Sequence, residues 1–314
     1  MAHFQENTIV SFHDDVDTHL RIGKLIGSGT QADVYKALDI LPNRYVAAKH
    51  LYGRYATDKD RFYQKACLLA KYPSPHPNFC WPMAVSQLTD NKSFVYIMPL
   101  LEGYRPLTDA INRVDPLTDR QKAQLLLKIA EAFDTLHKKK FIYGDISDRN
   151  ILYRINSDGS VSVKIIDCEN VTLAGFSFGL QGSGKYRAPE LLIPDPDRMD
   201  HKPKPPSKYS DTYAFQVLAF RVLLRRHPLD GKLARSVAAD DHQGFLKYYG
   251  YNPRFIFDGT ANNPGPRVSE NWAKLPMPMQ LYFRNCFSQT ALHQKEKRPS
   301  LEDFKIILSM SYCV

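Results

Sequence analysis

The chain has 314 residues, of which 43% are hydrophobic and 24% charged, a composition typical of soluble globular proteins. This length predicts two lobes or two domains rather than one compact core. No apolar run reaches the roughly 18 residues that a membrane-spanning helix needs, and the N-terminus does not have the pattern of a secretory signal. The five cysteines are scattered without a Cys-x-x-Cys pair, which favours a reducing, cytoplasmic compartment and no zinc site.

The formal net charge of +9 is compatible with acidic partners or nucleic acid. Because the Lys and Arg residues are spread along the chain, a general cationic surface is the simpler interpretation, and no nucleic acid is expected. The densest cationic cluster contains Lys202, Lys204 and Lys208. The prolines between these lysines predict an extended surface loop over residues 201–208, which could dock an acidic partner.

Residues 1–20 precede the first strand pattern and are expected to form an N-terminal extension. A solvated acidic turn explains the charged residues of this extension better than a metal site, because no further ligands cluster nearby. These residues are His13, Asp14, Asp15 and Asp17. Residues 21–98 contain short β-rich runs and one helix, expected from Asp58 to Lys71 and ended before Pro73. Residues 99–103 are expected to be a hinge.

The remaining residues, 104–314, have mostly helical patterns. Thr118 and Gln121 form a capping box at the start of a helix. One apolar face of this helix contains Leu125, Ile129, Phe133 and Leu136. A hairpin is predicted from strands at 151–155 and 161–166, and residues 213–224 are apolar on almost every side, which predicts a buried central helix.

Polar residues that suit phosphoryl transfer follow two of these apolar runs. Asp145 and Asn150 lie five residues apart after the capped helix, and Asp167 follows the second strand of the hairpin. One carboxylate can accept or orient the proton of an attacking hydroxyl group. The amide and the second carboxylate can hold the Mg²⁺ ions that neutralise a triphosphate.

Other motifs occur in a characteristic order around these residues. A glycine-rich run at 26–34 precedes Lys49 on a predicted strand, Asp167 begins the run Asp-Cys-Glu, and Ala-Pro-Glu occupies positions 188–190. With these motifs, residues 20–310 resemble the eukaryotic-type protein kinase family, and they look like the bacterial eukaryotic-like Ser/Thr kinases in particular. The resemblance implies an α+β, bilobal protein-kinase-like fold. The small β-rich N-lobe would span residues 21–98 and the large helical C-lobe residues 104–314.

The resemblance also implies the roles of individual residues. Asp145 would be the catalytic base, with Lys49 and Arg149 as catalytic cations, while Asn150 and Asp167 would bind Mg²⁺. ATP would be bound by the glycine-rich loop, by Lys49 and by apolar residues around the adenine. This set contains Gly27, Ser28, Gly29, Val34, Ala47, Lys49, Met98, Leu101 and Leu152.

The pattern departs from the family around Lys49. The family pairs this lysine with a helix glutamate, but that position falls on Lys65, and no Glu occurs between residues 55 and 75. Glu169 is our hypothesis for the replacement partner. Cys168, beside it, is expected to be a packed thiol rather than a redox switch.

The catalytic and activation segments also depart from the family. The usual His-Arg before the catalytic aspartate is Tyr143-Gly144, so activation through loop phosphorylation is less expected. Thr172, Ser177 and Ser183 are nevertheless possible phosphorylation sites. Two architectural features are retained, namely a buried pair between Glu190 and Arg298 and an aspartate, Asp211, expected to hold the catalytic loop.

The resemblance predicts an ATP- and Mg²⁺-dependent kinase that phosphorylates Ser or Thr of a protein as a cytoplasmic monomer or weak dimer. Two alternatives remain open. Gly144-Asp145 and the Asp167-x-Glu169 pattern also resemble the small-molecule phosphotransferases of the aminoglycoside and choline kinase group. The departures around Lys49 would also fit an ATP-binding pseudokinase scaffold. Ser147 and Arg149 leave specificity for Ser/Thr or Tyr open, and no membrane partner is expected.

Overall fold

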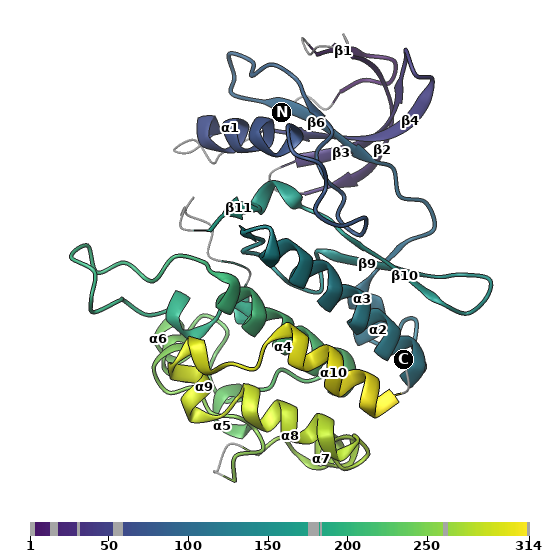
Figure 1. Cartoon of the computed structure of the whole chain (residues 1–314). Coiled ribbons are helices and arrows are strands. Elements are labelled where there is room, and N and C mark those ends of the chain that lie inside the picture. The colour runs from purple at the N-terminus through teal and green to yellow at the C-terminus, as the bar shows by residue number, and fades with distance from the viewer. Residues whose placement is uncertain are drawn as a thin grey trace. The chain divides into compact units, whose positions relative to one another are not determined.

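The computed structural model describes residues 4–12, 18–29, 32–52, 59–174, 182, 184–259 and 263–312, with only the backbone described at 59–61. Its chain divides into two compact units (Figure 1). The first unit consists of Met1–Tyr104 and Ile166–Glu169, and the second of Arg105–Ile165 and Asn170–Val314. The division falls between Tyr104 and Arg105, one residue beyond the predicted hinge at 99–103, and a short segment from later in the chain groups with the first unit.

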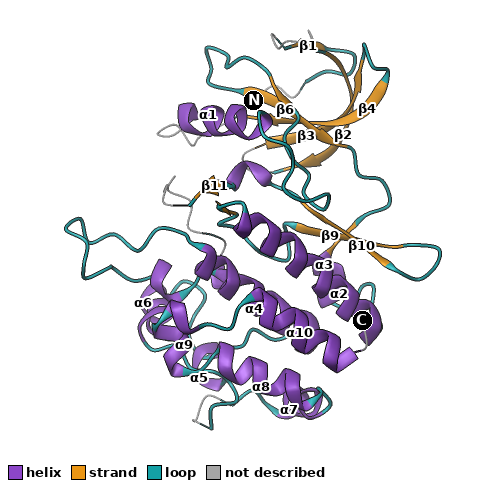
Figure 2. Ribbon diagram, viewed as in Figure 1, coloured by secondary structure: helices purple, strands orange, loops and turns teal. Residues whose placement is uncertain are grey.

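The first unit is built on a six-stranded antiparallel sheet with the strand order β1-β2-β3-β4-β6-β5 (Figure 2). The strands are β1 (Ile9–Ser11), β2 (His19–Ser28), β3 (Ala32–Asp39), β4 (Arg44–Leu51), β5 (Ala84–Val85) and β6 (Phe94–Pro99), and the helix is α1 (Lys59–Ala70). The sheet therefore begins at residue 9, within the expected extension. The acidic turn at 13–17 and the predicted helix start at Asp58 lie outside the described residues.

The two faces of this sheet have separate apolar clusters because successive side chains of a strand point to opposite faces. Val46, Ala48 and Ile97 pack on one face in a cluster that includes Phe12. Ala47, between two of these residues, joins the cluster on the other face, which contains Ala66 of α1. Ala47, two residues before Lys49 on β4, therefore lies on the face of the sheet that packs against α1.

The second unit is mostly helical (Figure 2). Its helices are α2 (Leu107–Ile111), α3 (Asp119–Lys138), α4 (Lys208–Leu224), α5 (Lys232–Arg235), α6 (His242–Leu246), α7 (Pro266–Ala273), α8 (Met277–Cys286), α9 (Gln289–His293) and α10 (Leu301–Tyr312). Shorter helical turns occur at Gly184–Tyr186, Pro189–Leu191, Lys247–Tyr251 and Lys295–Lys297, and a further turn, Cys168–Asn170, begins in the segment of the first unit and ends at the first residue of the second. The strands are β7 (Arg105–Pro106), β8 (Phe141–Ile142), β9 (Ile151–Ile155), β10 (Val161–Ile165) and β11 (Thr172–Leu173).

Several elements of the second unit confirm the sequence predictions. The capping box of α3 is present, and its apolar face from Leu125 to Leu136 is buried. β9 and β10 form the predicted antiparallel hairpin. Within the described part of the chain, none of the helices is long and apolar enough to cross a membrane.

The central helix α4 is buried as predicted but begins five residues earlier, at Lys208. Ser207 and Ser210 cap it reciprocally, since Ser207 N donates to Ser210 Oγ at 2.8 Å and Ser210 N donates to Ser207 Oγ. The proline pattern predicted an extended loop that includes Lys208, and this cap corrects that expectation. The loop up to Pro206 has no helix or strand, as predicted from its prolines.

Candidate active site

Lys49 is buried on β4 of the first unit, where it lies opposite Val34 on β3 and Tyr96 on β6. Its Nζ lies 2.8 Å from Asp167 Oδ1 and also forms an ion pair with Glu169. A buried ammonium is costly unless it is paired, and two carboxylates compensate this one. The expected pairing of Lys49 with Glu169 is therefore present in the structure.

The charges of this cluster stabilise each other. Burial acts to lower the pKa of Lys49, but the nearby Glu169 and Asp167 outweigh it and raise that pKa. Burial likewise opposes ionisation of Glu169, yet attraction by Lys49 and a hydrogen bond from Tyr96 hold the pKa of that carboxyl below its usual value. Tyr96 OH donates to Glu169 Oε2 at 2.6 Å. Lys49 and Glu169 are therefore both charged at neutral pH.

The pKa of Asp167 shifts in the opposite direction from that of Glu169. Burial and the adjacent charge of Glu169 raise its pKa, although Lys49 acts in the opposite direction. Its backbone has φ of +58°, a left-handed conformation that is uncommon for a residue with a side chain. Such conformations concentrate at functional sites because the surrounding structure must maintain them. A second cation beside Asp167 would favour its charged form.

Lys65 of α1 occupies the position that the family reserves for a glutamate. Its side chain is only 4% exposed. Burial lowers its pKa to about 8, while the charge of Glu169 opposes that shift. α1 therefore contributes a cation to this cluster, and the carboxylate comes from Glu169 in the turn Cys168–Asn170.

The predicted glycine-rich loop is the connection between β2 and β3. Gly27 lies opposite Val34, and Gly29 N donates to Ala32 O at 2.9 Å, while residues 30 and 31 lie outside the described chain. A Cβ at Gly27 would meet Val34 at an ordinary 3.7 Å, so packing within the chain does not require glycine there. A loop without side chains lets backbone amides approach a phosphate group.

The apolar residues predicted to contact adenine gather in the first unit. Ala47 and Met98 are members of one buried cluster, and Val34 and Leu101 pack against it. Leu152 lies on β9 of the second unit, where it is partly buried. Four of the predicted adenine contacts therefore share one apolar surface within the first unit.

The second unit contains the loop with Asp145 and Asn150. Asn150 Nδ2 donates to Asp145 O at 2.9 Å and to Asp145 Oδ2 at 3.0 Å. These bonds leave the Asn150 amide oxygen as a hard ligand, since no described residue donates to it. Asn150 in this unit and Asp167 in the first unit have the oxygen donors that suit Mg²⁺.

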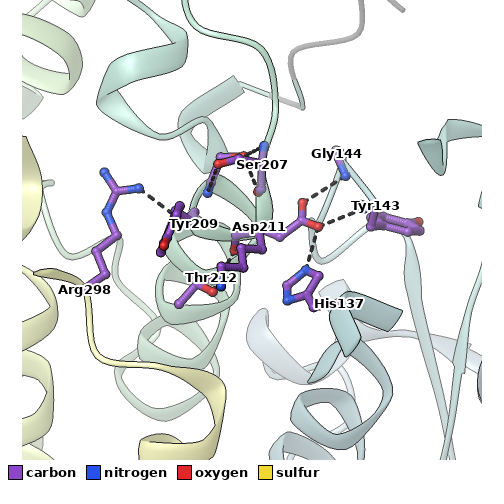
Figure 3. A network of polar contacts seen from close by, with 10 residues as sticks. His137, Tyr143, Gly144, Ser207, Tyr209, Asp211, Thr212 and Arg298 are labelled. Carbon is purple, nitrogen blue, oxygen red and sulfur yellow. Dashed lines mark hydrogen bonds and ion pairs between the residues drawn. The ribbon is translucent and has the colours of Figure 1, made fainter. Parts of the chain in front are cut away.

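Asp211 of α4 holds this loop, as Figure 3 shows. Its carboxylate accepts hydrogen bonds from Tyr143 N at 2.8 Å and from Gly144 N at 2.9 Å. His137 Nε2 of α3 lies 2.9 Å from the same carboxylate. The predicted role of Asp211 is confirmed, because a buried carboxylate that accepts several hydrogen bonds fixes the backbone that donates them.

The geometry of the loop also explains Gly144, one of the departures from the family. Its φ of +80° is a conformation that glycine adopts readily. Gly182 has the same φ, and a Cβ added to it would meet Gly144 O at 3.1 Å. The activation segment therefore passes close to the catalytic loop at a point where both backbones use glycine.

The second architectural prediction is also confirmed. Arg298 Nη1 and Nη2 donate to Glu190 Oε1 and Oε2 at 2.7 and 2.6 Å, in a bidentate pair. The same guanidinium donates to Ala291 O and Tyr209 O. Arg298 thus ties the Ala-Pro-Glu motif to α4 and α9.

Other predicted positions differ in their surroundings. Cys168 is buried and its burial raises the pKa of the thiol, as expected for a packed cysteine. Thr172 is 7% exposed on β11, so it is poorly accessible to a modifying enzyme, and Ser177 and Ser183 lie outside the described residues. Arg149 is exposed and lines a cavity beside the catalytic loop.

Two residues that support this site from other elements belong to no sequence motif. Tyr96 was recognisable only as an apolar strand residue, and its register opposite Lys49 comes from pairing of β4 with β6. Arg221 of α4, which pairs with Asp148 at 3.1 Å, was hidden in an apolar helix pattern. A charged residue within an otherwise apolar helix was the available signal.

Comparison with known proteins identifies the class to which this fold and site belong. Residues 20–303 match the family described as the protein kinase domain. The chain therefore belongs to the protein kinase family, and its sheet-rich first unit and helical second unit are the two lobes of the α+β fold expected from the sequence.

Individual relatives are bacterial. The chain is 29% identical to the serine/threonine-protein kinase PrkC of Bacillus subtilis over 225 residues. This alignment covers 69% of the chain and 32% of PrkC. It is 28% identical over 233 residues to the probable serine/threonine-protein kinase PknB of Lactococcus lactis, an alignment that covers 71% of the chain and 34% of PknB. It is 25% identical over 269 residues to the serine/threonine-protein kinase PknL of Mycobacterium tuberculosis, an alignment that covers 81% of the chain and 63% of PknL. The chain thus spans about a third of the first two relatives.

Proposed function

We propose that this chain transfers the γ-phosphate of Mg-ATP to a Ser or Thr hydroxyl of a protein. The observation that carries the proposal is the buried cluster of Lys49, Glu169 and Asp167, which keeps the phosphate-binding lysine charged despite the missing helix glutamate. The names of the bacterial relatives support Ser/Thr specificity.

In this mechanism Lys49 would orient the ATP phosphates, and Asp145 would accept or orient the proton of the acceptor hydroxyl. Asn150 and Asp167 would hold Mg²⁺, which supplies neutralisation of the negative charge on the transferred group. Arg149 remains the candidate for a further cation near that group. Catalysis would rest mainly on positioning, because the Asp211 contacts hold the catalytic loop before substrate binds.

A protein acceptor is favoured over a small molecule by the architecture of the second unit. The pair between Glu190 and Arg298 and the contacts of Asp211 maintain the segment that presents an acceptor peptide in protein kinases. A pseudokinase is disfavoured because the compensated Lys49 and the Asn150–Asp145 hydrogen bonds are both retained. Cys67, Cys80, Cys168 and Cys286 are thiols rather than members of disulfides, which supports a reducing, cytoplasmic location, and a monomer or weak dimer remains our prediction.

The test compares wild type with Asp145→Asn for transfer of label from γ-labelled ATP with Mg²⁺, to the protein itself and to a generic protein acceptor. We expect Asp145→Asn to lower the rate by about a hundredfold or more, since general acid–base groups contribute roughly that factor. Asp158→Asn, on the exposed turn between β9 and β10, is the matched control and should retain activity. ATP-dependent thermal stabilisation should persist in both variants.

Equal labelling by wild type and Asp145→Asn would contradict the role of Asp145. An absence of label despite ATP-dependent stabilisation would contradict protein phosphorylation. In that case, ATP consumption in the presence of a panel of hydroxylated metabolites would identify a small-molecule kinase, and its absence would identify a pseudokinase.

A further inference from the structure

The second unit contains a cavity of about 490 Å³ beside its catalytic loop. Ser147, Asp148 and Arg149 of that loop line one side, and Lys185 of the activation segment contributes to the wall. The end of α4 supplies another side, with three arginines, Arg221, Arg225 and Arg226. Ser147, the first loop residue that lines the cavity, follows the proposed catalytic base Asp145 by two positions. The cavity is large enough for one or two side chains.

The charges that line this cavity do not balance. Two of its cations have carboxylate partners, since Arg221 pairs with Asp148 at 3.1 Å and Lys185 pairs with Asp230 at 3.0 Å. Arg149, Arg225 and Arg226 have no carboxylate partner among the residues that the structure describes. The cavity therefore has an excess of three guanidinium groups.

The histidine in the wall does not change this excess. His227 is buried, and burial lowers its pKa to about 4, so its ring is neutral at pH 7. Its Nε2 lies 2.9 Å from Lys185 O, which holds the ring in place. The positive charge of the cavity consequently comes from arginines, which remain protonated at any physiological pH.

Arg226 is also incompletely satisfied. Its Nε is buried and has no hydrogen-bond partner within the described chain. Buried polar groups in proteins are nearly always hydrogen-bonded, and an unpaired one is costly, so rotation of the Arg226 side chain toward an anion in the cavity would relieve that cost. An anionic side chain would supply both the acceptor and the missing negative charge.

A cation near the end of α4 has a simpler explanation, because cations are favoured at helix C-termini. That explanation does not extend to Arg149, which lies on the catalytic loop. It also does not explain why arginines from two elements line one cavity. Convergence of unpaired arginines on a concave surface is the arrangement that proteins use to bind carboxylate and phosphate groups.

We propose that this cavity selects acceptor proteins with an anionic side chain close in sequence to the phosphorylated hydroxyl. The anion would be the carboxylate of Asp or Glu or the phosphate of an already phosphorylated residue. The proposal rests on the proposed function, because it names the acceptor class of the same reaction. Attraction between the excess guanidinium charge and the acceptor would lower KM for anionic acceptors relative to neutral ones.

The experiment measures kcat/KM of the full chain on peptides of one length that share a single Ser and differ only in its flanking residues. The flanks are Asp, phosphoserine, Ala or Lys, with the flanking phosphoserine distinguished from the acceptor by mass spectrometry. We expect the Asp or the phosphoserine peptide to be preferred over the Ala peptide by about tenfold or more, and the higher of the two identifies the anion. Arg226→Gln should reduce that preference severalfold while leaving the Ala peptide nearly unaffected.

Arg267→Gln on α7 is the matched control, because Arg267 is exposed and does not line the cavity. It should retain the wild-type preference. Arg226→Glu should shift the preference toward the Lys peptide. Binding can also be measured without turnover. Fluorescence anisotropy gives the affinity of the wild-type chain for a labelled Asp-flanked peptide in which Ala replaces the acceptor Ser.

The outcomes separate this proposal from the proposed function. Equal kcat/KM for the Asp, phosphoserine and Ala peptides would overturn the selectivity of the cavity while leaving the kinase activity established. Loss of preference in Arg267→Gln to the same extent as in Arg226→Gln would show general attraction rather than this cavity. If no peptide is phosphorylated, the proposed function fails, and equal anisotropy of Asp- and Ala-flanked peptides would then reject the cavity independently.

Discussion

At the scale of residues, the site differs from the family through an exchange of charge. Lys65 stands where a helix glutamate is expected, and Glu169 supplies the carboxylate to Lys49 from another part of the chain. The sequence was sufficient to suggest Glu169, because it is close to Asp167 and because α1 has no glutamate. The sequence did not show that Lys65 is buried, since its apolar environment arises only when α1 packs on the sheet.

Replacement of Glu169 by glutamine tests the exchanged pair. The amide cannot balance the ammonium of Lys49, and removing one partner of a buried ion pair typically costs about 3–5 kcal/mol. We expect a lower free energy of unfolding and a higher KM for ATP, with kcat reduced about tenfold or more. Urea denaturation and steady-state kinetics at varied ATP concentration measure these effects.

Glu102→Gln is the matched control, since Glu102 is exposed and pairs with Lys36 on the surface at 3.2 Å. Exposed pairs contribute roughly 0–1 kcal/mol, so this variant should resemble wild type. If Glu169→Gln leaves ATP affinity and turnover intact, Glu169 is not the functional partner of Lys49.

At the scale of elements, the long helices and the β9–β10 hairpin were predictable because each has a strong local pattern. The capping box of α3 and the apolar periodicity after it identify the helix without tertiary information. β1 was not predictable, because three residues have too little pattern to distinguish a strand from a tail. Its existence depends on pairing with β2 and on the burial of Phe12, which follows it.

The N-terminal segment has further contacts with the sheet. Phe4 stacks on His50 at 4.3 Å between ring centroids, and Phe4 N donates to Tyr35 OH at 3.1 Å. Tyr35 lies on β3, a few residues after the glycine-rich loop. The segment is therefore part of the first unit's core rather than an appendage to it.

Replacement of Phe12 by alanine tests this packing. Phe12 is fully buried, and truncation of a buried Phe typically destabilises by about 3–5 kcal/mol through lost transfer energy and a cavity. Ile9→Ala on the same segment is the control, because Ile9 is 51% exposed and should change stability by less than about 1 kcal/mol. Urea denaturation measures the free energy of unfolding of both variants. A loss for Phe12→Ala as small as that for Ile9→Ala would show that Phe12 contributes no core packing.

At the scale of the whole molecule, the sequence predicted two lobes, and the structure has two compact units. The segment Ile166–Glu169 groups with the first unit although both flanking segments belong to the second. Sequence patterns could not reveal this grouping, because contacts such as the ion pairs of Lys49 with Asp167 and Glu169 join residues that lie far apart in the sequence. Asp167, a metal-binding candidate, thus belongs to the first unit although the residues on both sides of its short segment belong to the second.

The division of the chain into two compact units predicts that unfolding is not a single transition. The first unit depends on the cluster around Phe12, and the second has aromatic packing around Phe220, whose ring lies 5.1 Å from that of Phe283. Chains with more than one core commonly depart from two-state behaviour. In hydrogen exchange with increasing urea, we expect Phe12→Ala to reduce protection in β2, β3 and β4 more than in α3 and α4. Phe220→Ala should do the opposite, because its cavity lies in the second core.

Phe304→Leu in the second unit is the milder companion to Phe220→Ala, since it retains most of the apolar volume at a buried site. It should lower protection of α4 and α10 less than Phe220→Ala does. If each severe variant reduces protection equally across all elements of both units, the chain unfolds as one cooperative body. Independent loss of protection would instead show that the free energy of unfolding of each unit resides in its own core.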